Sequence, residues 1–351
     1  MKKTPVIFAP RYEITPVLLS RIKEIAHLIA ELNLRRFPRP VLVEFERSAR
    51  ELSAYASTSI EGNPLPLTEV RRLLKNAPTN LRDSEREVFN YNEALVALRE
   101  KKGDAKFDAA LILDIHRRVM AGLLDRWRVG KFRKEPVVVN DPVRRTVDYL
   151  PPDHGDVAPL MEALTAWVSR SRRELDPVVV AGIFHRQFVI IHPFVDGNGR
   201  TARLATKFLL ADMGIDTFEL FSFENYYNRQ VSRYFAAVGS HGNYYDMVDA
   251  VDFTAWLEYF AGGIADELQR VKKELEKHLG GIEPELSAAE KVILAYIEEH
   301  GSITDREYAT LTDRAKATRA LDFKRLTGKG LIVRRGGGRN TKYVGGDSPF
   351  H

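Results

Sequence analysis

With 351 residues, 44% of them hydrophobic and 29% charged, the chain has the composition of a globular protein of two or three domains, and its net charge of +5 identifies no partner. The absence of cysteine excludes disulfide bonds and thiolate metal sites, and it favours a reducing, cytoplasmic location. No apolar run reaches the ~18 to 20 residues of a membrane span, and no apolar stretch follows the N-terminal lysines, so neither a membrane anchor nor a secretory signal is expected.

Residues 1–104 are predicted to form a helical N-terminal region. An amphipathic stripe covers Val17–Ile29, and a second helix over Val41–Ser59 places its apolar residues on one face. Gly62 is expected to end this second helix, which leaves Glu61 at its C-terminus. Taken alone, a glutamate at such a position needs no function.

A β-hairpin is predicted after the segment Gly130–Arg133. Two β-prone runs, Val137–Val139 and Thr146–Tyr149, flank the turn-forming sequence Asn-Asp-Pro at residues 140–142. Taken alone, this is an ordinary hairpin at the edge of a sheet.

Two helices are predicted to meet within residues 191–203 (Ile-His-Pro-Phe-Val-Asp-Gly-Asn-Gly-Arg-Thr-Ala-Arg), the most informative segment of the chain. The preceding run, 177–191, is apolar nearly all round and is expected to be a buried helix that stops at His192, because a proline follows. A second helix is predicted over 199–213. Between the two helices, residues 197–199 (Gly-Asn-Gly) allow positive φ angles, so backbone N–H groups can face an anion at the helix N-terminus.

Four side chains of this segment suit phosphate chemistry. His192, with an unperturbed pKa of about 6.5, can accept a proton from a hydroxyl nucleophile. Asp196 can hold Mg²⁺, which prefers oxygen ligands. Arg200 and Arg203 lie three residues apart, on one face of the first helical turn. Each feature alone is more often structural, but their order and spacing together favour a phosphate-handling site.

The segment matches every fixed position of the pattern His-x-Phe-x-Asp/Glu-Gly-Asn-Gly-Arg-x-x-Arg and so resembles the signature of the Fic family. The resemblance implies transfer of AMP from ATP to Ser, Thr or Tyr hydroxyls of target proteins, including the enzyme itself. It implies that His192 is the base, that Asp196 binds Mg²⁺ (or Mn²⁺), and that Arg203 contacts the γ-phosphate. Phe194 would anchor the loop in the core. The implied nucleotide site comprises Asp196, Gly197, Asn198, Gly199, Arg200, Thr201, Ala202 and Arg203.

Three further features follow from the resemblance. The segment 57–63 (Ser-Thr-Ser-Ile-Glu-Gly-Asn) is similar to the inhibitory motif of Fic proteins, which implies that Glu61 pairs with Arg203 and withholds it from the γ-phosphate. The hairpin is similar to the flap of Fic proteins, to which a target segment adds as a strand. Asn225 and Phe235 lie where the family forms its nucleoside pocket, among aromatic residues that can equally belong to the core.

The predicted organisation is mainly α. A Fic-type helical core with its hairpin flap follows the N-terminal region over residues 105–275, and a linker containing two glycines and a proline covers 276–285. Residues 286–351 form a separate C-terminal module.

The C-terminal module is predicted to hold three helices and a glycine-rich hairpin. Ser287 with Glu290, and Thr304 with Glu307, form capping boxes for the first two helices, and the third is expected to begin at Asp313. This outline resembles a winged helix-turn-helix. Its third helix and hairpin are strongly basic, which favours DNA binding, although such modules also mediate protein contacts.

Two functions of different classes therefore remain open. One is an adenylyltransferase restrained by Glu61, and the other is a DNA-binding transcriptional regulator whose Fic-like domain senses nucleotide. Removal rather than addition of AMP, and a homodimer formed through the N-terminal helices, are also compatible with the sequence.

Overall fold

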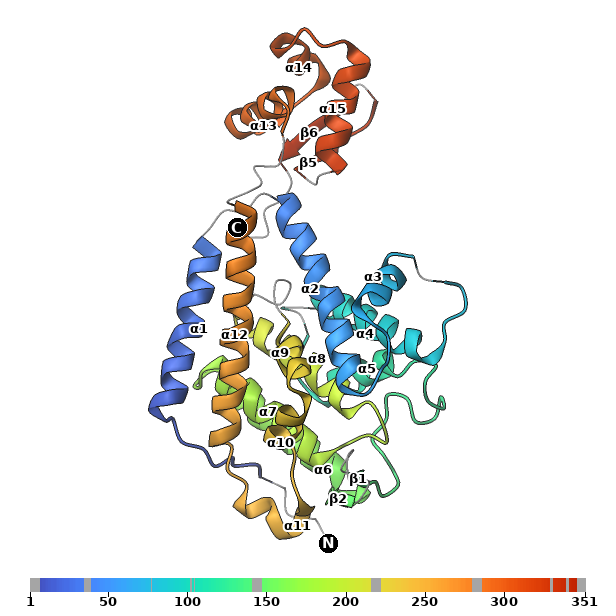
Figure 1. The fold of residues 1–351 in the computed structure, drawn as a ribbon, viewed down its shortest axis with the longest axis vertical. Helices are drawn as coiled ribbons and strands as arrows, with labels where there is room; N and C mark the ends of the chain where they lie inside the picture. The colour runs from blue at the N-terminus through green and yellow to red at the C-terminus, as the bar shows by residue number, and fades with distance from the viewer. Residues whose placement is uncertain are drawn as a thin grey trace. The chain divides into compact units, whose positions relative to one another are not determined.

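The computed structural model of the chain describes residues 7–34, 39–76, 78–101, 103, 105–140, 147–215, 222–279, 286–328, 331–338 and 341–345. Within them lie fifteen α-helices and six short strands, so the chain is mainly α, as predicted (Figure 1). None of these helices is long and apolar enough to cross a membrane. The fold divides into two compact units, Met1–Ile29 with Ser48–Arg270, and Ala30–Arg47 with Val271–His351.

The core of the first unit is built around two consecutive helices. α7 (Pro177–Ile191) buries nearly all of its side chains, which explains why its sequence is apolar on every face. It packs against α8 (Asn198–Asp212) and α6 (His154–Ser171), while α8 also contacts α4 (Asp83–Glu100) and α5 (Ala109–Val119). The turn between α7 and α8 is therefore held between two buried helices.

The other helices complete the two units. The division between the units falls within α1, α2 and α12. The predicted second helix is confirmed by α2, and Gly62 follows it with a positive φ of 93°. The bounds are α1 (Pro16–Leu34), α2 (Arg39–Ile60), α3 (Leu67–Lys75), α9 (Phe223–Arg229), α10 (Val231–Val238), α11 (Tyr244–Met247), the 3₁₀ helix η1 (Val248–Ala250) and α12 (Thr254–Leu279).

The predicted hairpin is confirmed. β1 (Val139–Asn140) pairs antiparallel with β2 (Val147–Leu150). Asn140 of the predicted turn belongs to β1, and Asp141 and Pro142 lie outside the described residues. β2 also pairs in parallel with β3 (Gly242–Asn243), which the local sequence pattern did not predict. In the order β1-β2-β3, β1 is an edge strand.

Tyr149 attaches this small sheet to the end of α7. Its side chain is buried, and its hydroxyl donates a hydrogen bond to the Ile190 carbonyl at 2.9 Å. The hairpin is thus fixed two residues before His192.

Besides parts of α1, α2 and α12, the described residues of the second unit form three helices and a three-stranded sheet. Both predicted capping boxes are present, at Ser287 with Glu290 and at Thr304 with Glu307. A short additional strand, β4, extends the sheet to the order β4-β6-β5. The elements are α13 (Ala288–His300), β4 (Ser302–Ile303), α14 (Asp305–Leu311), α15 (Lys316–Gly328), β5 (Ile332–Arg335) and β6 (Lys342–Gly345).

Two predictions for this unit need correction or lie outside the described residues. The third helix begins at Lys316 rather than Asp313, because the Thr312 hydroxyl accepts the backbone N–H of Arg314 at 3.3 Å and forms a local turn there. The linker predicted over 276–285 begins too early, because α12 continues to Leu279. Residues 280–285 of the linker, and residues 339 and 340 of the predicted hairpin, are not among those described.

Candidate active site

His192 ends α7 in an unusual backbone conformation. With φ 49° and ψ 62°, it is the one non-glycine residue with a positive φ in the described part of the chain. A left-handed conformation costs such a residue on the order of 1–2 kcal/mol, so its surroundings must stabilise it. The Arg133 guanidinium donates to the His192 carbonyl at 2.9 Å, and the Arg133 backbone N–H donates to the Pro193 carbonyl at 3.0 Å. Arg133 therefore positions the catalytic candidate.

The His192 imidazole is suited to accept a proton. Burial lowers its pKa to about 4, against a smaller opposing effect of the Val189 carbonyl, so the ring is neutral near pH 7. Nδ1 lies 3.4 Å from the Val189 carbonyl, and since a carbonyl oxygen only accepts, Nδ1 carries the hydrogen in this contact. Nε2 is then unprotonated, as a general base requires.

The loop after His192 is closed on itself by Asn198. The Asn198 side-chain amide donates to the Phe194 carbonyl at 2.8 Å, and its Oδ1 accepts the Phe194 N–H at 2.9 Å. Both Asn198 and Phe194 are buried. The Asn198 side chain thus shapes the loop and is not free to contact a ligand.

His116, which is not among the predicted site residues, supports the same loop from α5. Its ring stacks on Phe194 with 3.7 Å between centroids, and its Nδ1 accepts the Gly130 N–H at 2.9 Å. Its Nε2 therefore carries the hydrogen and donates to the Asp196 carbonyl at 3.0 Å. Burial lowers the pKa of His116 to about 4, which keeps this arrangement neutral. No local pattern marks His116, because its partners lie far along the chain.

The N-terminus of α8 offers backbone donors to an anion. Gly197 is the N-cap, with a left-handed φ of 78°, and a Cβ there would collide with Met120. A glycine brings no side-chain oxygen to cap the helix, so the first N–H groups of α8 keep their capacity to bind a ligand.

Asp196 presents the carboxylate beside this helix end. Its side chain is 57% exposed, and its Oδ1 lies 3.3 Å from Nη2 of Arg200. Arg200 is buried and also lies 3.1 Å from Glu87. No group of three His, Cys, Asp or Glu side chains that could hold a metal occurs among the described residues. Asp196 is therefore a lone carboxylate in position for a metal that phosphates would also bind.

Arg203 is fully buried, yet charged. Its Nε donates to the Ser57 hydroxyl at 2.8 Å, and its Nη2 donates to the Ser57 carbonyl at 2.9 Å and to Glu61 Oε1 at 2.6 Å. Burial lowers the pKa of Arg203, but the Glu61 carboxylate and the neighbouring tyrosines more than offset this and leave it above its usual value. The predicted contact between Glu61 and Arg203 is present.

Glu61 lies directly over the first turn of α8. A Cβ at Gly199 would collide with Glu61 Oε1, so the carboxylate touches the helix backbone there. The Glu61 side chain is 31% exposed, while its partner Arg203 has no exposed surface. A negative group thus occupies the place beside the helix N-terminus and the buried arginine where a phosphate would find both.

A second ion pair, fully buried, lies one turn further along α8. Lys207 of α8 lies 3.0 Å from Glu224 of α9, and its ammonium donates to the Ser53 hydroxyl of α2 at 2.7 Å. The Tyr91 hydroxyl donates to Glu224 at 2.9 Å. All four side chains are buried. The segment that carries Glu61 is therefore anchored to α8 at two successive turns.

The remaining predicted site residues lie elsewhere or face inward. Thr201 and Ala202 have no exposed surface, so only the backbone of α8 can meet a ligand there. Asn225 donates to Glu267 of α12 at 2.6 Å, and Phe235 lies on α10, 38% exposed. In the described part of the chain, neither Asn225 nor Phe235 makes a hydrogen bond, ion pair or ring contact with residues 192–203.

The central part of the chain matches a known family. Residues 106–210 match the model of the Fic/DOC family. They include α5, the hairpin strands β1 and β2, and the complete loop from His192 to Arg203. These residues form a Fic/DOC-family domain.

Curated relatives are similar over part of the chain. The protein adenylyltransferase Fic of Drosophila melanogaster is 37% identical over 168 residues, which are 46% of this chain and 32% of the relative. The protein of the same name from Drosophila mojavensis is 36% identical over 168 residues, 46% of this chain and 31% of the relative. The match therefore spans about a third of these relatives.

Solved structures share the fold. A Fic family protein from Desulfovibrio desulfuricans G20 superimposes with a TM-score of 0.66 at 21% identity, covering 96% of this chain and 98% of that one. Fic-1 (residues 134–508) from C. elegans gives a TM-score of 0.58 at 23% identity, covering 74% and 73%. These similarities support the Fic-type helical fold.

Proposed function

We propose that this chain is a protein adenylyltransferase that transfers AMP from ATP to Ser, Thr or Tyr hydroxyls, and that Glu61 holds it in an inactive state. The observation that carries the proposal is the contact of the Glu61 carboxylate with both the buried Arg203 and the first turn of α8. Burying an arginine and its acidic partner beside a helix N-terminus has a large desolvation cost. This cost favours a function for the buried cation.

The residues of the loop divide the chemistry between them. Nε2 of His192 accepts the proton of the target hydroxyl while the hydroxyl oxygen attacks the α-phosphorus. The bond from the α-phosphorus to its bridging oxygen breaks, and pyrophosphate leaves. The backbone N–H groups at Gly197–Gly199 stabilise the negative charge that develops on the phosphates, and Arg203 holds the γ-phosphate.

A divalent cation fits the donor set. Mg²⁺ usually keeps several waters and binds one or two carboxylates together with substrate phosphates. Asp196, a single and largely exposed carboxylate beside the phosphate-binding turn, suits this mode for Mg²⁺ or Mn²⁺. The metal would neutralise part of the negative charge on the departing pyrophosphate.

The inhibition follows from competition for one cation. While Glu61 bonds to Nη2 of Arg203, the arginine cannot offer that donor to a γ-phosphate, and the two anions would repel each other. ATP can then bind only weakly or in a poor geometry. The default state of the enzyme is off.

Transfer of label from α-labelled ATP tests the proposal. With Mg²⁺, the Glu61→Gly variant is expected to label itself or an added acceptor protein more strongly than the wild type. Adding His192→Ala to that variant is expected to abolish the labelling. No transfer by Glu61→Gly under Mg²⁺ or Mn²⁺ would refute the activity, and release of label from pre-labelled protein as the faster reaction would favour AMP removal.

The second unit carries a second candidate function, DNA binding. Not all of its basic residues are available: Arg319 pairs with Asp305 at 2.9 Å, and Arg314 pairs with the buried Asp322 at 2.9 Å. The exposed ones on α15 and the two long strands are Lys316, Lys324, Arg325, Arg334, Arg335 and Lys342. This charge favours a nucleic-acid phosphate backbone, and retardation of genomic fragments at low salt tests it.

Assembly and location stay predictions. A homodimer through the N-terminal helices is checked by the mass in solution. A cytoplasmic location is checked by fractionation of cells that express the chain.

A further inference from the structure

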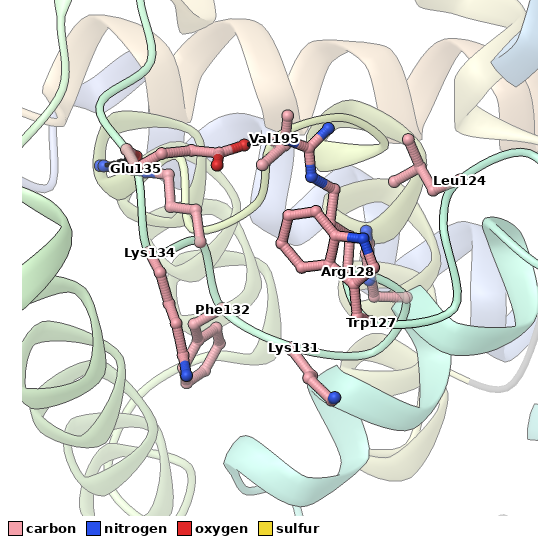
Figure 2. Close-up of a pocket in the computed structure, with 10 residues that line it drawn as sticks. Leu124, Trp127, Arg128, Lys131, Phe132, Lys134, Glu135 and Val195 are labelled. Atoms are coloured by element: carbon pink, nitrogen blue, oxygen red, sulfur yellow. Dashed lines mark hydrogen bonds and ion pairs between the residues drawn. The ribbon is translucent and has the colours of Figure 1, made fainter.

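A pocket of about 170 Å³ lies beside the catalytic loop (Figure 2). Val195 of the signature segment lines it, together with His116, which bonds to the carbonyl of the next residue, Asp196. The rest of the lining comes from residues 124–135, the segment that leads toward the hairpin. The pocket therefore adjoins the loop that carries His192, but none of the functions described above uses it.

The basic residues that line the pocket outnumber the acidic ones. Four of its residues are basic and only Glu135 is acidic. Glu135 is paired with Arg128 at 2.6 Å, and Arg133 is bonded to the His192 carbonyl. The ammonium groups of Lys131 and Lys134 remain exposed, and in Figure 2 both side chains extend to the same side, away from Val195.

Two further observations point to an incoming group. Nε of Arg128 is buried and has no hydrogen-bond partner within the described residues. Trp127 beside it is 57% exposed, with the Arg128 guanidinium 4.5 Å above its ring. An exposed tryptophan and an unsatisfied buried donor at the rim of a basic pocket are typical of a surface that a partner covers.

The pocket is also close along the chain to the edge strand of the hairpin. Residues 136–138 join its lining directly to β1, and β1 is the edge strand of its sheet. A peptide that adds to β1 would continue past Lys134. At a strand rise of about 3.3 Å per residue, the five residues from Val139 to Lys134 span at most roughly 17 Å. A peptide paired with β1 therefore needs no more than about five further residues to extend to Lys134 at the pocket.

We propose that this pocket binds an acidic side chain of the target segment, so that the enzyme selects hydroxyls that have Asp or Glu residues nearby on one side. The inference rests on the proposed transferase function and deepens it by naming the class of acceptor. Lys131 and Lys134 attract the carboxylate, Arg128 Nε donates to it, and Trp127 covers the chain that carries it.

The tryptophans of the chain provide a readout that does not depend on transfer. The chain has three, of which Trp167 and Trp256 are buried and Trp127 is exposed at the pocket. The experiment titrates the full wild-type chain with serine-containing decapeptides that lack tryptophan, and records tryptophan emission. One peptide has acidic residues on one side of the serine, one has their amides, and one has lysines.

The acidic peptide is expected to shift the emission and to bind at least about tenfold more tightly than the amide and lysine peptides. Trp127→Phe should remove the response. The double variant Lys131→Glu/Lys134→Glu should reverse the preference toward the lysine peptide. Lys23→Glu/Lys106→Glu changes the net charge equally at exposed positions that do not line the pocket, and it should leave the preference intact.

Equal responses to the three peptides, or none, would overturn the proposal, as would an equal response to inorganic phosphate. Because the readout is binding, its failure is distinct from a failure of the Glu61→Gly variant to transfer label. If that variant does transfer, it is also expected to label the acidic peptide in preference to its amide counterpart.

Discussion

Helix α8 of the first unit and helix α15 of the second both carry several basic residues, but these residues differ in burial. Arg200, Arg203 and Lys207 of α8 are all buried, and each has an acidic partner from another element: Glu87, Glu61 and Glu224. On α15, Lys316, Lys324 and Arg325 are exposed, and the partly buried Arg319 pairs with the exposed side chain of Asp305.

This difference separates basic residues whose charge must be compensated in the folded state from basic residues that are solvated. A buried cation costs several kcal/mol unless a partner compensates it, so each of the three on α8 required a matching acid at a distant position. An exposed cation requires nothing and contributes little to folding. The overall net charge does not distinguish the buried cations from the exposed ones.

The largest expected effect is on transfer. In the Glu61→Gly background, His192→Ala should lower the rate of label transfer by about 10²–10⁴-fold, since it removes the proposed general base. The melting temperature should change little. His27→Ala, at an exposed position on α1, is the matched control and should leave the rate unchanged. Transfer within tenfold of the parent would exclude His192 as the base.

The buried pair of Lys207 on α8 and Glu224 on α9 should have the largest effect on the free energy of unfolding. Glu224→Leu leaves Lys207 buried without its counter-ion and is expected to lower the free energy of unfolding by about 3–5 kcal/mol, measured by urea denaturation. Adding Lys207→Met should restore much of the loss. The exposed pair of Arg229 and Asp266 is the control, and Asp266→Ala should cost less than about 1 kcal/mol. Equal losses for the two pairs would contradict the distinction.

The unequal success of prediction from sequence has the same physical origin. The loop at 192–203 could be predicted because its pattern is contiguous, and the ends of α7 and α8 follow from a proline and a glycine close by. His116, Arg133 and Glu224 could not, because their roles depend on contacts to residues more than fifty positions away: Asp196, His192 and Tyr91. The position of Asn225 in the chain predicts a place in the nucleoside pocket, whereas its side chain donates a hydrogen bond to Glu267.

Acid should weaken the fold through its buried histidines. Burial lowers the pKa of His116 and His192 to about 4 and that of His185 to about 3, whereas in the unfolded chain they titrate near the usual value of about 6.5. Below pH 6.5 the unfolded state binds more protons, so the free energy of unfolding should fall between pH 6.5 and about 4, by up to ~1.4 kcal/mol per pH unit for each histidine.

Urea midpoints at pH 7.5, 6 and 5 measure this dependence. His185→Gln should reduce the slope between pH 6 and 5. A stability that is constant over this range would show that the histidines are not held neutral.

The smallest effect is expected on the exposed surface of the second unit. Lys324→Ala/Arg325→Ala should change the free energy of unfolding by no more than about 0.5 kcal/mol and should leave label transfer unchanged. If the unit binds DNA, the same variant should weaken that binding and flatten its salt dependence. A loss of stability above 1 kcal/mol would show that these exposed cations are not as independent as the structure indicates.

Competition between Glu61 and a γ-phosphate for Arg203 is best measured by comparing the affinities of ATP and ADP in four forms of the chain. These are the wild type, Glu61→Gly, Arg203→Ala and the double variant, all titrated with Mg²⁺ present. Glu61→Gly is expected to tighten ATP binding by about 5–150-fold and ADP binding much less, and Arg203→Ala should remove that preference whether or not Glu61 is present. If Glu61→Gly binds ATP no better than the wild type, or gains equally for ATP and ADP, then Glu61 does not hold Arg203 away from a γ-phosphate.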